Sequence, residues 1–101
     1  MDIKIGDIFH STWGYDMTHN EYYQVVGITP SGKSVKVCKL ESVKTVGVWQ
    51  GQEEPLENKF IDKPKTKRLL ESYDGKPALK MKSYEWAKLW NGQPNWFSHI
   101  D

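Results

Sequence analysis

The sequence predicts a mainly β fold: a small antiparallel barrel or bent sheet, Src-homology-3-like, with one short C-terminal helix. Short runs of β-branched and aromatic residues recur along the chain, and turn residues separate them about every 8–12 positions, which is typical of such barrels. Five Trp, five Tyr and three Phe supply large side chains for a core. A length of 101 residues predicts one β-rich domain, residues 1–101. The alternative is an α+β arrangement with a helix across an antiparallel sheet.

The N-terminal strand is expected after a turn. Ile3 and Ile5 alternate with polar residues, Gly6-Asp7 indicates a turn or bulge, and Phe9 and Trp13 then fall on one face of a strand.

The clearest element is a hairpin within residues 21–42. Its two β-branched runs flank Pro30-Ser31-Gly32-Lys33, a typical antiparallel turn composition. Cys38 lies in the second run, where we expect a small, half-buried core residue.

The middle of the chain is less regular. Residues 42–52 alternate weakly and are expected to continue or follow the hairpin sheet. Residues 53–68 hold Pro55 and Pro64 among charged residues, which predicts a loop with a short strand near Lys59–Ile61.

The C-terminal third contains a second hairpin and the expected helix. Asp74-Gly75 is a strong hairpin turn between two apolar runs. Trp86 and Trp90 are spaced i, i+4, which favours a short helix over Ser83–Trp90, ending at Asn91-Gly92. Both tryptophans are expected in the core, as is Trp13, whereas Trp49 and Trp96 are expected to be partly exposed. Residues 93–101 are expected to pack back onto the sheet.

Charge and cysteine content exclude several classes of protein. The formal charge of +1 creates no global field toward nucleic acid or membranes. A single cysteine excludes an intramolecular disulfide and a multi-cysteine zinc site. The sequence has neither a signal-peptide pattern nor an apolar run long enough to span a membrane. We therefore expect a protein of the bacterial cytoplasm.

No motif indicates catalysis, a metal or a cofactor. His19-Asn20-Glu21 matches the His-x-Glu half of a zinc deaminase signature, but the required Cys-x-x-Cys half is missing. Residues 29–34 end in Gly-Lys-Ser but lack the upstream glycine of a phosphate-binding loop. We accordingly predict no catalytic, cofactor-binding or metal-binding residues.

Two segments resemble a widespread group of small phage and prophage proteins. In that group a Trp-Gly-Tyr-Asp-Gln-Thr segment precedes a Tyr-Gln-Val-Val-like strand, and a Tyr-Asp-Gly-Lys segment precedes Ser-Tyr-x-Trp-Ala. The first segment is matched by residues 13–16 and Thr18, with Met17 in place of the usual Gln, and the second by residues 73–76 and 83–87. The resemblance implies a mobile-element protein and supplies no catalytic residues.

The leading functional hypothesis is a non-enzymatic binding module that contacts a bacterial host protein, such as a defence or regulatory complex. Its expected contact residues are Trp13, Tyr15, Asp16, His19 and Glu21. Asp16 and Asn20 are expected to hold the turn. The alternative is a nucleic-acid-binding barrel, whose phosphate contacts would be Lys63, Lys65, Lys67, Arg68, Lys80 and Lys82, with exposed aromatics stacking on bases. A third hypothesis is a small enzyme built on Asp16, His19 and Glu21. The oligomeric state stays open.

Overall fold

The structure is a computed structural model that describes residues 3–13, 18–47, 49–82 and 85–98, with Trp13 described only in its backbone. It contains eight strands, and no helix occurs within these described ranges. The strands are β1 (Ile8–Trp13), β2 (His19–Ile28), β3 (Ser34–Val46), β4 (Gln50–Phe60), β5 (Lys65–Glu71), β6 (Pro77–Lys82), β7 (Glu85–Leu89) and β8 (Asn95–Ser98). The expected mainly β class is confirmed.

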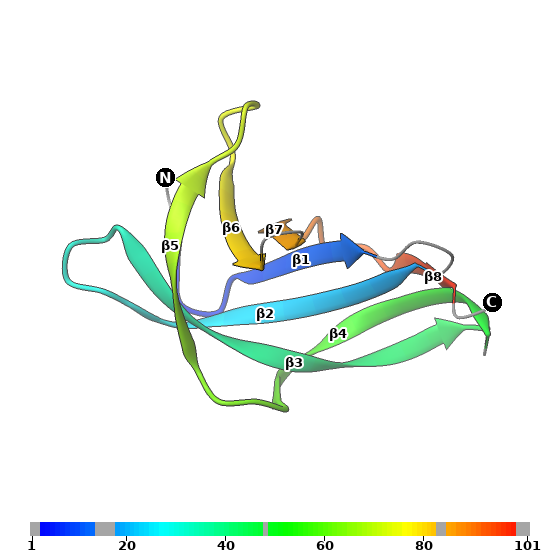
Figure 1. Cartoon of the computed structure of the whole chain (residues 1–101). Helices are drawn as coiled ribbons and strands as arrows, with labels where there is room; N and C mark the ends of the chain where they lie inside the picture. The colour runs from blue at the N-terminus through cyan, green and yellow to red at the C-terminus, as the bar shows by residue number, and fades with distance from the viewer. Residues whose placement is uncertain (1–2, 14–17, 48, 83–84, 99–101) are drawn as a thin grey trace.

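Six of the strands close into an antiparallel ring (Figure 1). The order around the ring is β2-β1-β7-β6-β5-β3, and β3 pairs back onto β2. The ring pairs strands that are far apart in the sequence, because Phe9 on β1 lies opposite Leu89 on β7. The barrel therefore leaves no free edge in these six strands.

The other two strands form a flap beside the barrel. β3 is long enough to leave the ring after Leu40 and pair with β4, and β4 pairs with β8. We call β4, β8 and the second half of β3 the flap. It packs against the outer face of β2, so β2 is covered on both faces.

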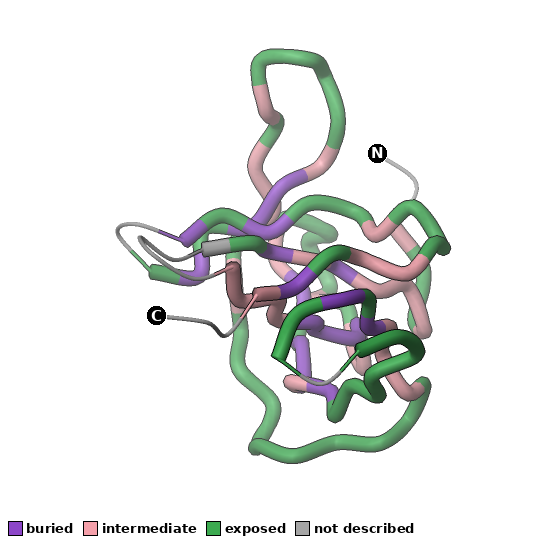
Figure 2. The backbone as a smooth tube through the Cα atoms, turned by 90° about the vertical axis from the view of Figure 1, so that its right-hand side faces the viewer, coloured by how far each residue is buried: buried purple, intermediate pink, exposed green. Residues whose placement is uncertain are grey.

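The main core fills the inside of the ring (Figure 2). Residues alternate between the two faces of each strand, and the buried members of this core are Phe9, Tyr23, Val25, Val35, Val37, Leu79, Met81 and Ala87. A second buried layer lies between β2 and the flap, where Tyr22 and Phe97 are almost completely inaccessible. The prediction that the C-terminal tail packs back onto the sheet is confirmed by Phe97.

Local turn chemistry explains the two predicted hairpins. β2 and β3 are joined through Gly32, which has a φ of 73°, and β5 and β6 through Gly75, which has a φ of 81°. Asp74 supports the second turn by accepting a hydrogen bond from the Lys76 amide at 3.1 Å. The β5–β6 hairpin projects from the barrel, as Figure 1 shows.

Two predicted elements are wrong. The expected helix over Ser83–Trp90 is strand β7, in which buried Glu85 and Ala87 alternate with exposed Trp86 and Lys88. That alternation has the period of a strand, and β7 is held between β1 and β6. The α+β alternative required this helix and is therefore also wrong.

The expected loop at residues 53–68, with a short strand near Lys59–Ile61, is instead strand as far as Phe60, where β4 ends, and strand again from Lys65, where β5 begins. Pro55 is tolerated there because it lies at a register shift of the β3–β4 ladder, opposite Ser42, where the regular pairing is interrupted. None of the described residues forms a helix long and apolar enough to cross a membrane.

Candidate functional site

The segment singled out by the sequence joins β1 to β2. Trp13 pairs with His19 in the last step of that ladder, and Thr18 forms a separate bridge to Ser98 at the end of β8. The predicted contact residues Tyr15 and Asp16 lie outside the described residues, as does the side chain of Trp13. The described end of the segment, Thr18, lies beside β8 of the flap.

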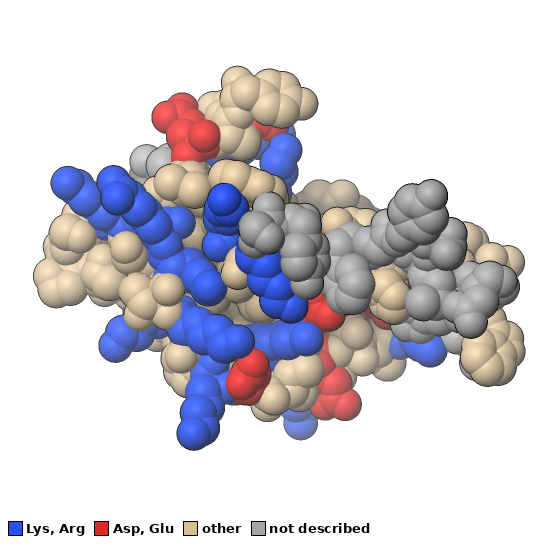
Figure 3. Space-filling view, in the orientation of Figure 1, with Lys and Arg blue, Asp and Glu red and all other residues tan. Residues whose placement is uncertain are grey.

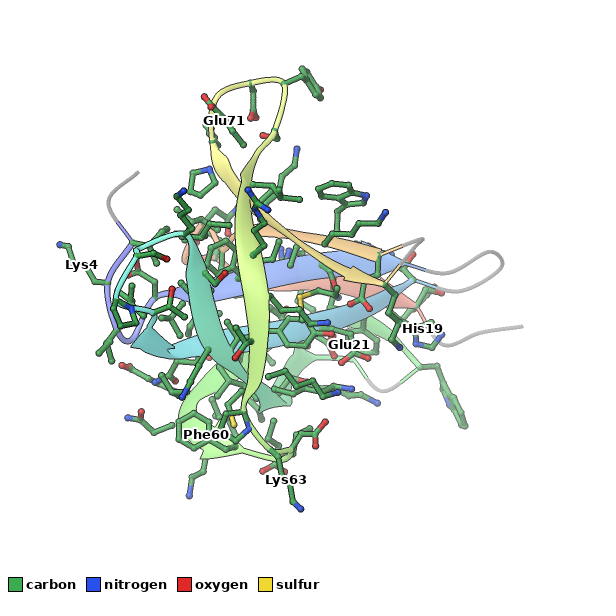
Figure 4. The ribbon with its side chains drawn as sticks, turned by 60° about the vertical axis from the view of Figure 1, so that its left-hand side comes forward. Lys4, His19, Glu21, Phe60, Lys63 and Glu71 are labelled. Carbon is green, nitrogen blue, oxygen red and sulfur yellow. The ribbon has the colours of Figure 1, made fainter. Side chains whose placement is uncertain are left out.

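His19 and Glu21 lie on the same face of β2, two residues apart (Figure 4). Glu21 forms an ion pair with Lys39 on β3, with 2.8 Å between carboxylate oxygen and Nζ. Both predicted residues line a shallow groove of about 330 Å³ that also contains Ser42 and Ile61. The structure thus brings two of the five predicted contact residues together, at the end of the barrel nearest the join.

Asn20 points to the opposite face and connects the barrel to the flap. Its Nδ2 donates to the carbonyl of Trp96 at 2.7 Å, so its Oδ1 accepts from His10 Nε2, also at 2.7 Å. The sequence predicts that Asn20 holds the turn, whose residues 14–17 lie outside the described ranges; the described bonds of its side chain run to β1 and β8.

His10 lies on β1, and its side chain is held against β2 and the flap. Its ring stacks on Tyr22 with centroids 5.0 Å apart. Burial lowers the pKa of His10 below its ordinary value, although the hydrogen bond to Asn20 and the charge of Glu53 act in the opposite direction. His10 is therefore a structural histidine that favours its neutral form.

The outer face of the flap exposes large apolar side chains. Trp96 is 54% exposed and Trp49 is 70% exposed, and Val46 lies opposite Gln52 next to Trp96 in the ladder. The expectation of partial exposure is confirmed for both tryptophans. The register places Val43, Val46 and Trp96 on one face of the flap, and Trp49 lies in the connection between β3 and β4. These four exposed residues are called the flap patch below.

The predicted basic residues do not share one face. Lys65 and Lys67 lie opposite Val37 and Val35, whose side chains point into the barrel, so these two lysines lie at the barrel opening. Arg68 and Lys80 lie on the outer face. Lys63 lies in the connection before β5, and Lys82 ends β6. Figure 3 nevertheless shows that lysine and arginine side chains gather over β5 and its neighbours.

A cavity of about 200 Å³ lies at the barrel opening. Its lining residues are Tyr23, Val37, Lys39, Asp62, Lys63, Lys65, Met81 and Lys82. Two of these lysines are already paired with carboxylates, Lys39 with Glu21 and Lys65 with Asp62 at 3.5 Å. Much of the positive charge at this opening is therefore compensated locally.

A buried carboxylate that the sequence did not indicate lies inside the barrel. Glu85 is 1% exposed, and its Oε2 accepts hydrogen bonds from the hydroxyls of Tyr23, at 2.9 Å, and Ser11. Burial and this carboxylate raise the pKa of Tyr23. Three strands of the ring, β1, β2 and β7, are joined by this network.

Trp86 is not in the core, contrary to expectation. It is 47% exposed on the outer face of β7, and Lys80 Nζ lies 5.9 Å from its ring centroid. Tyr73, at the tip of the β5–β6 hairpin, is fully exposed, and Lys88 Nζ lies 5.6 Å from its ring.

Within the residues described, no group of three or more His, Cys, Asp or Glu side chains could hold a metal ion. His19 and Glu21 are the described members of the third, enzymatic hypothesis, and the Glu21 carboxylate is paired with Lys39.

Comparison with protein-family models, curated proteins and solved structures returns no match to this chain. The likeness to a Src-homology-3 barrel and to the phage group consequently stays a prediction.

Proposed function

We propose that the protein is a non-catalytic binding module that acts through protein–protein contact in the bacterial cytoplasm. The observation that carries the proposal is the flap patch, where Trp49 and Trp96 are each more than half exposed. Exposed tryptophan is uncommon on a monomer surface without a role, and it is among the residues that dominate binding energy at protein interfaces.

The position of the flap patch adds support. The Thr18–Ser98 bridge and the bond from Asn20 to the Trp96 carbonyl attach the β1–β2 join to the same strand that carries Trp96. The described residues Thr18 and Asn20 of the predicted contact segment therefore lie beside the strand that carries Trp96. Gln52 and Glu54 on β4 lie between Val43 and Val46 of β3 and Trp96 of β8, so polar and apolar side chains alternate across this face.

The resemblance to phage and prophage proteins suggests the class of partner, a host defence or regulatory protein. Small domains of this kind act by occupying a surface of such a complex rather than by turnover. The proposed contact set is the flap patch together with the 13–21 segment.

Quantitative affinity capture from bacterial lysate tests the proposal with matched variants. The interface variant is Trp49→Ala with Trp96→Ala, and the control is Trp86→Ala, which removes a similarly exposed tryptophan from a different strand. We expect the wild type and the control to retain one specific host protein, and the interface variant to lose it at least about tenfold. Equal recovery by all three proteins, or no specific protein with the wild type, would overturn the proposal.

A further inference from the structure

We infer a second binding surface, for single-stranded nucleic acid, on the outer face of β5, β6 and β7. This surface is separate from the flap patch and does not depend on the function proposed above. It also differs from the basic stretch that the sequence indicates, because only Arg68 and Lys80 of that stretch belong to it.

The register of the strands places its residues in one sheet face. Lys80 lies opposite Trp86, and Ala78 lies opposite Lys88. The neighbouring residues Leu79 and Ala87 point into the core, so Lys80, Trp86 and Lys88 point outward. Arg68, opposite Ser34, continues this face onto β5, and Lys36 continues it onto β3.

Two aromatic rings provide flat surfaces for stacking. The rings of Trp86 and Tyr73 are both exposed, and a hollow of about 430 Å³ lies along them. Ala78 lines this hollow with a small side chain, and Glu71, Ser72 and Lys88 complete its lining. Every nucleobase has a flat face, so stacking on such rings binds bases without demanding a particular sequence.

A lysine accompanies each ring. Lys80 Nζ lies 5.9 Å from the centroid of Trp86, and Lys88 Nζ lies 5.6 Å from that of Tyr73. A base stacked on either ring would bring its phosphate within reach of the adjacent ammonium group. The pairing of ring and cation is what a strand of alternating bases and phosphates requires.

Among the described residues, neither ion pair involves a cation of this face. The two ion pairs found among the described residues, Lys39–Glu21 and Lys65–Asp62, lie at the barrel opening. Two acidic groups of the β5–β6 hairpin lie near Lys88: Glu71 lines the same hollow, and Asp74, which is hydrogen-bonded to Ser72 and the Lys76 amide, interacts electrostatically with Lys88. The outward-pointing cations of this face, Lys36, Arg68, Lys80 and Lys88, therefore lie on four adjacent strands, across a width of about 14 Å.

Single strands fit this surface better than duplex DNA or an acidic protein. In a duplex the base faces are already stacked inside the helix, and the carboxylates of an acidic peptide have no flat rings to place on Trp86 and Tyr73. The β1–β2 side of the barrel is covered by the flap, whereas no described element packs over β6 and β7, so a strand has access.

Fluorescence anisotropy with a labelled oligothymidylate of about 12 nucleotides tests the inference. Binding should appear at about 50 mM salt and weaken roughly fiftyfold at about 200 mM, since four phosphate contacts give a log–log slope of about −3. Trp86→Ala should weaken binding by about five- to a hundredfold, and Trp86→Phe should restore part of it. Lys80→Glu combined with Lys88→Glu should abolish binding.

Matched controls separate this surface from the rest of the protein. Trp96→Ala and Lys59→Glu remove an exposed tryptophan and add negative charge on the flap, and both should bind the oligonucleotide like the wild type. If Trp86→Ala fails to fold, Tyr73→Ala at the hairpin tip replaces it. Because the proposed protein interface is tested with Trp49 and Trp96, the two proposals can fail separately.

Three outcomes would overturn the inference. The first is no anisotropy change at low salt. The second is that polyglutamate of equal charge displaces the labelled oligonucleotide as effectively as unlabelled oligothymidylate does. That result would indicate a site for an acidic protein. The third is unchanged affinity in Trp86→Ala and Tyr73→Ala.

Discussion

Cys38 shows how burial changes the pKa and the reactivity of a single thiol. Its Sγ–H donates to the carbonyl of Asp62 at 2.9 Å, and burial, followed by the charge of Asp62, raises the pKa of the thiol. The thiolate is the reactive form. We expect the folded protein to react with Ellman's reagent at least about a hundredfold more slowly than the denatured protein, through opening of residues 60–63. Equal rates in the two states would contradict this packing.

His10 predicts a dependence of stability on pH. Its folded-state pKa lies below the ordinary 6.5, chiefly through desolvation. As the pH falls below 6.5, His10 binds a proton in the unfolded chain before it does so in the folded chain. Acidification therefore favours unfolding. Urea titrations should show a free energy of unfolding that falls between about pH 7 and pH 5, more steeply than in His10→Gln. Parallel pH profiles for both proteins would show that His10 does not contribute.

Substitutions at Glu85 test how much the buried hydrogen-bond network stabilises the protein. Glu85→Ala leaves the hydroxyls of Ser11 and Tyr23 without their acceptor inside the barrel and should destabilise the protein by about 2–4 kcal/mol. Glu85→Gln keeps an acceptor oxygen of the same reach and should cost less. Chemical denaturation of the two variants measures the difference, and equal losses would mean that volume rather than hydrogen bonding stabilises this position.

At the scale of elements, the end of the flap depends on one close approach between strands. Gly51 has a φ of 152°, and a Cβ there would collide with the carbonyl oxygen of Val46. Gly32 in the β2–β3 turn also has positive φ, but the space around it is open.

Comparing alanine at these two glycines separates collision from strain. Gly32→Ala should cost only the conformational strain, about 1–2 kcal/mol, whereas Gly51→Ala should also open the β3–β4 ladder. Hydrogen exchange should then show loss of protection in β4 and β8 with β5 and β6 unaffected. Protection that is unchanged in Gly51→Ala would contradict the close approach.

Elements that depend on neighbours in sequence could be predicted, and elements that depend on distant partners could not. The β2–β3 and β5–β6 hairpins follow from their turn residues. In contrast, the i, i+4 spacing of Trp86 and Trp90 suggested a helix because nothing local reveals that β1 and β6 flank this segment. Non-local pairing overrides a weak local preference.

The same limit applies to the candidate sites. Glu85 meets Ser11 and Tyr23 across 74 and 62 residues of sequence, so its burial has no local signature. Of the predicted basic residues, strand alternation sends Lys65 and Lys67 to the barrel opening and Arg68 to the outer face. A run of basic residues in a strand therefore predicts charge but not a common surface, until the strand's register is known.

At the scale of the whole molecule, ring closure sets the positions of the two proposed surfaces. β6 is three strands away from β2 in either direction around the ring, and the flap packs on the outside of β2. The flap patch and the β5–β7 face consequently lie on opposite sides of the barrel, with the packed core between them.

This separation predicts energetic independence of Trp86 and Trp96. Their strands, β7 and β8, pair with no common strand, and changes at distant sites add within about 0.3–0.5 kcal/mol. Unfolding of Trp86→Ala, Trp96→Ala and the double variant in urea should therefore give additive losses of stability. The same cycle, measured by oligonucleotide binding, should show the whole loss in Trp86→Ala and none added by Trp96→Ala. A coupling above about 1 kcal/mol in either cycle would mean that the barrel transmits changes between its two faces.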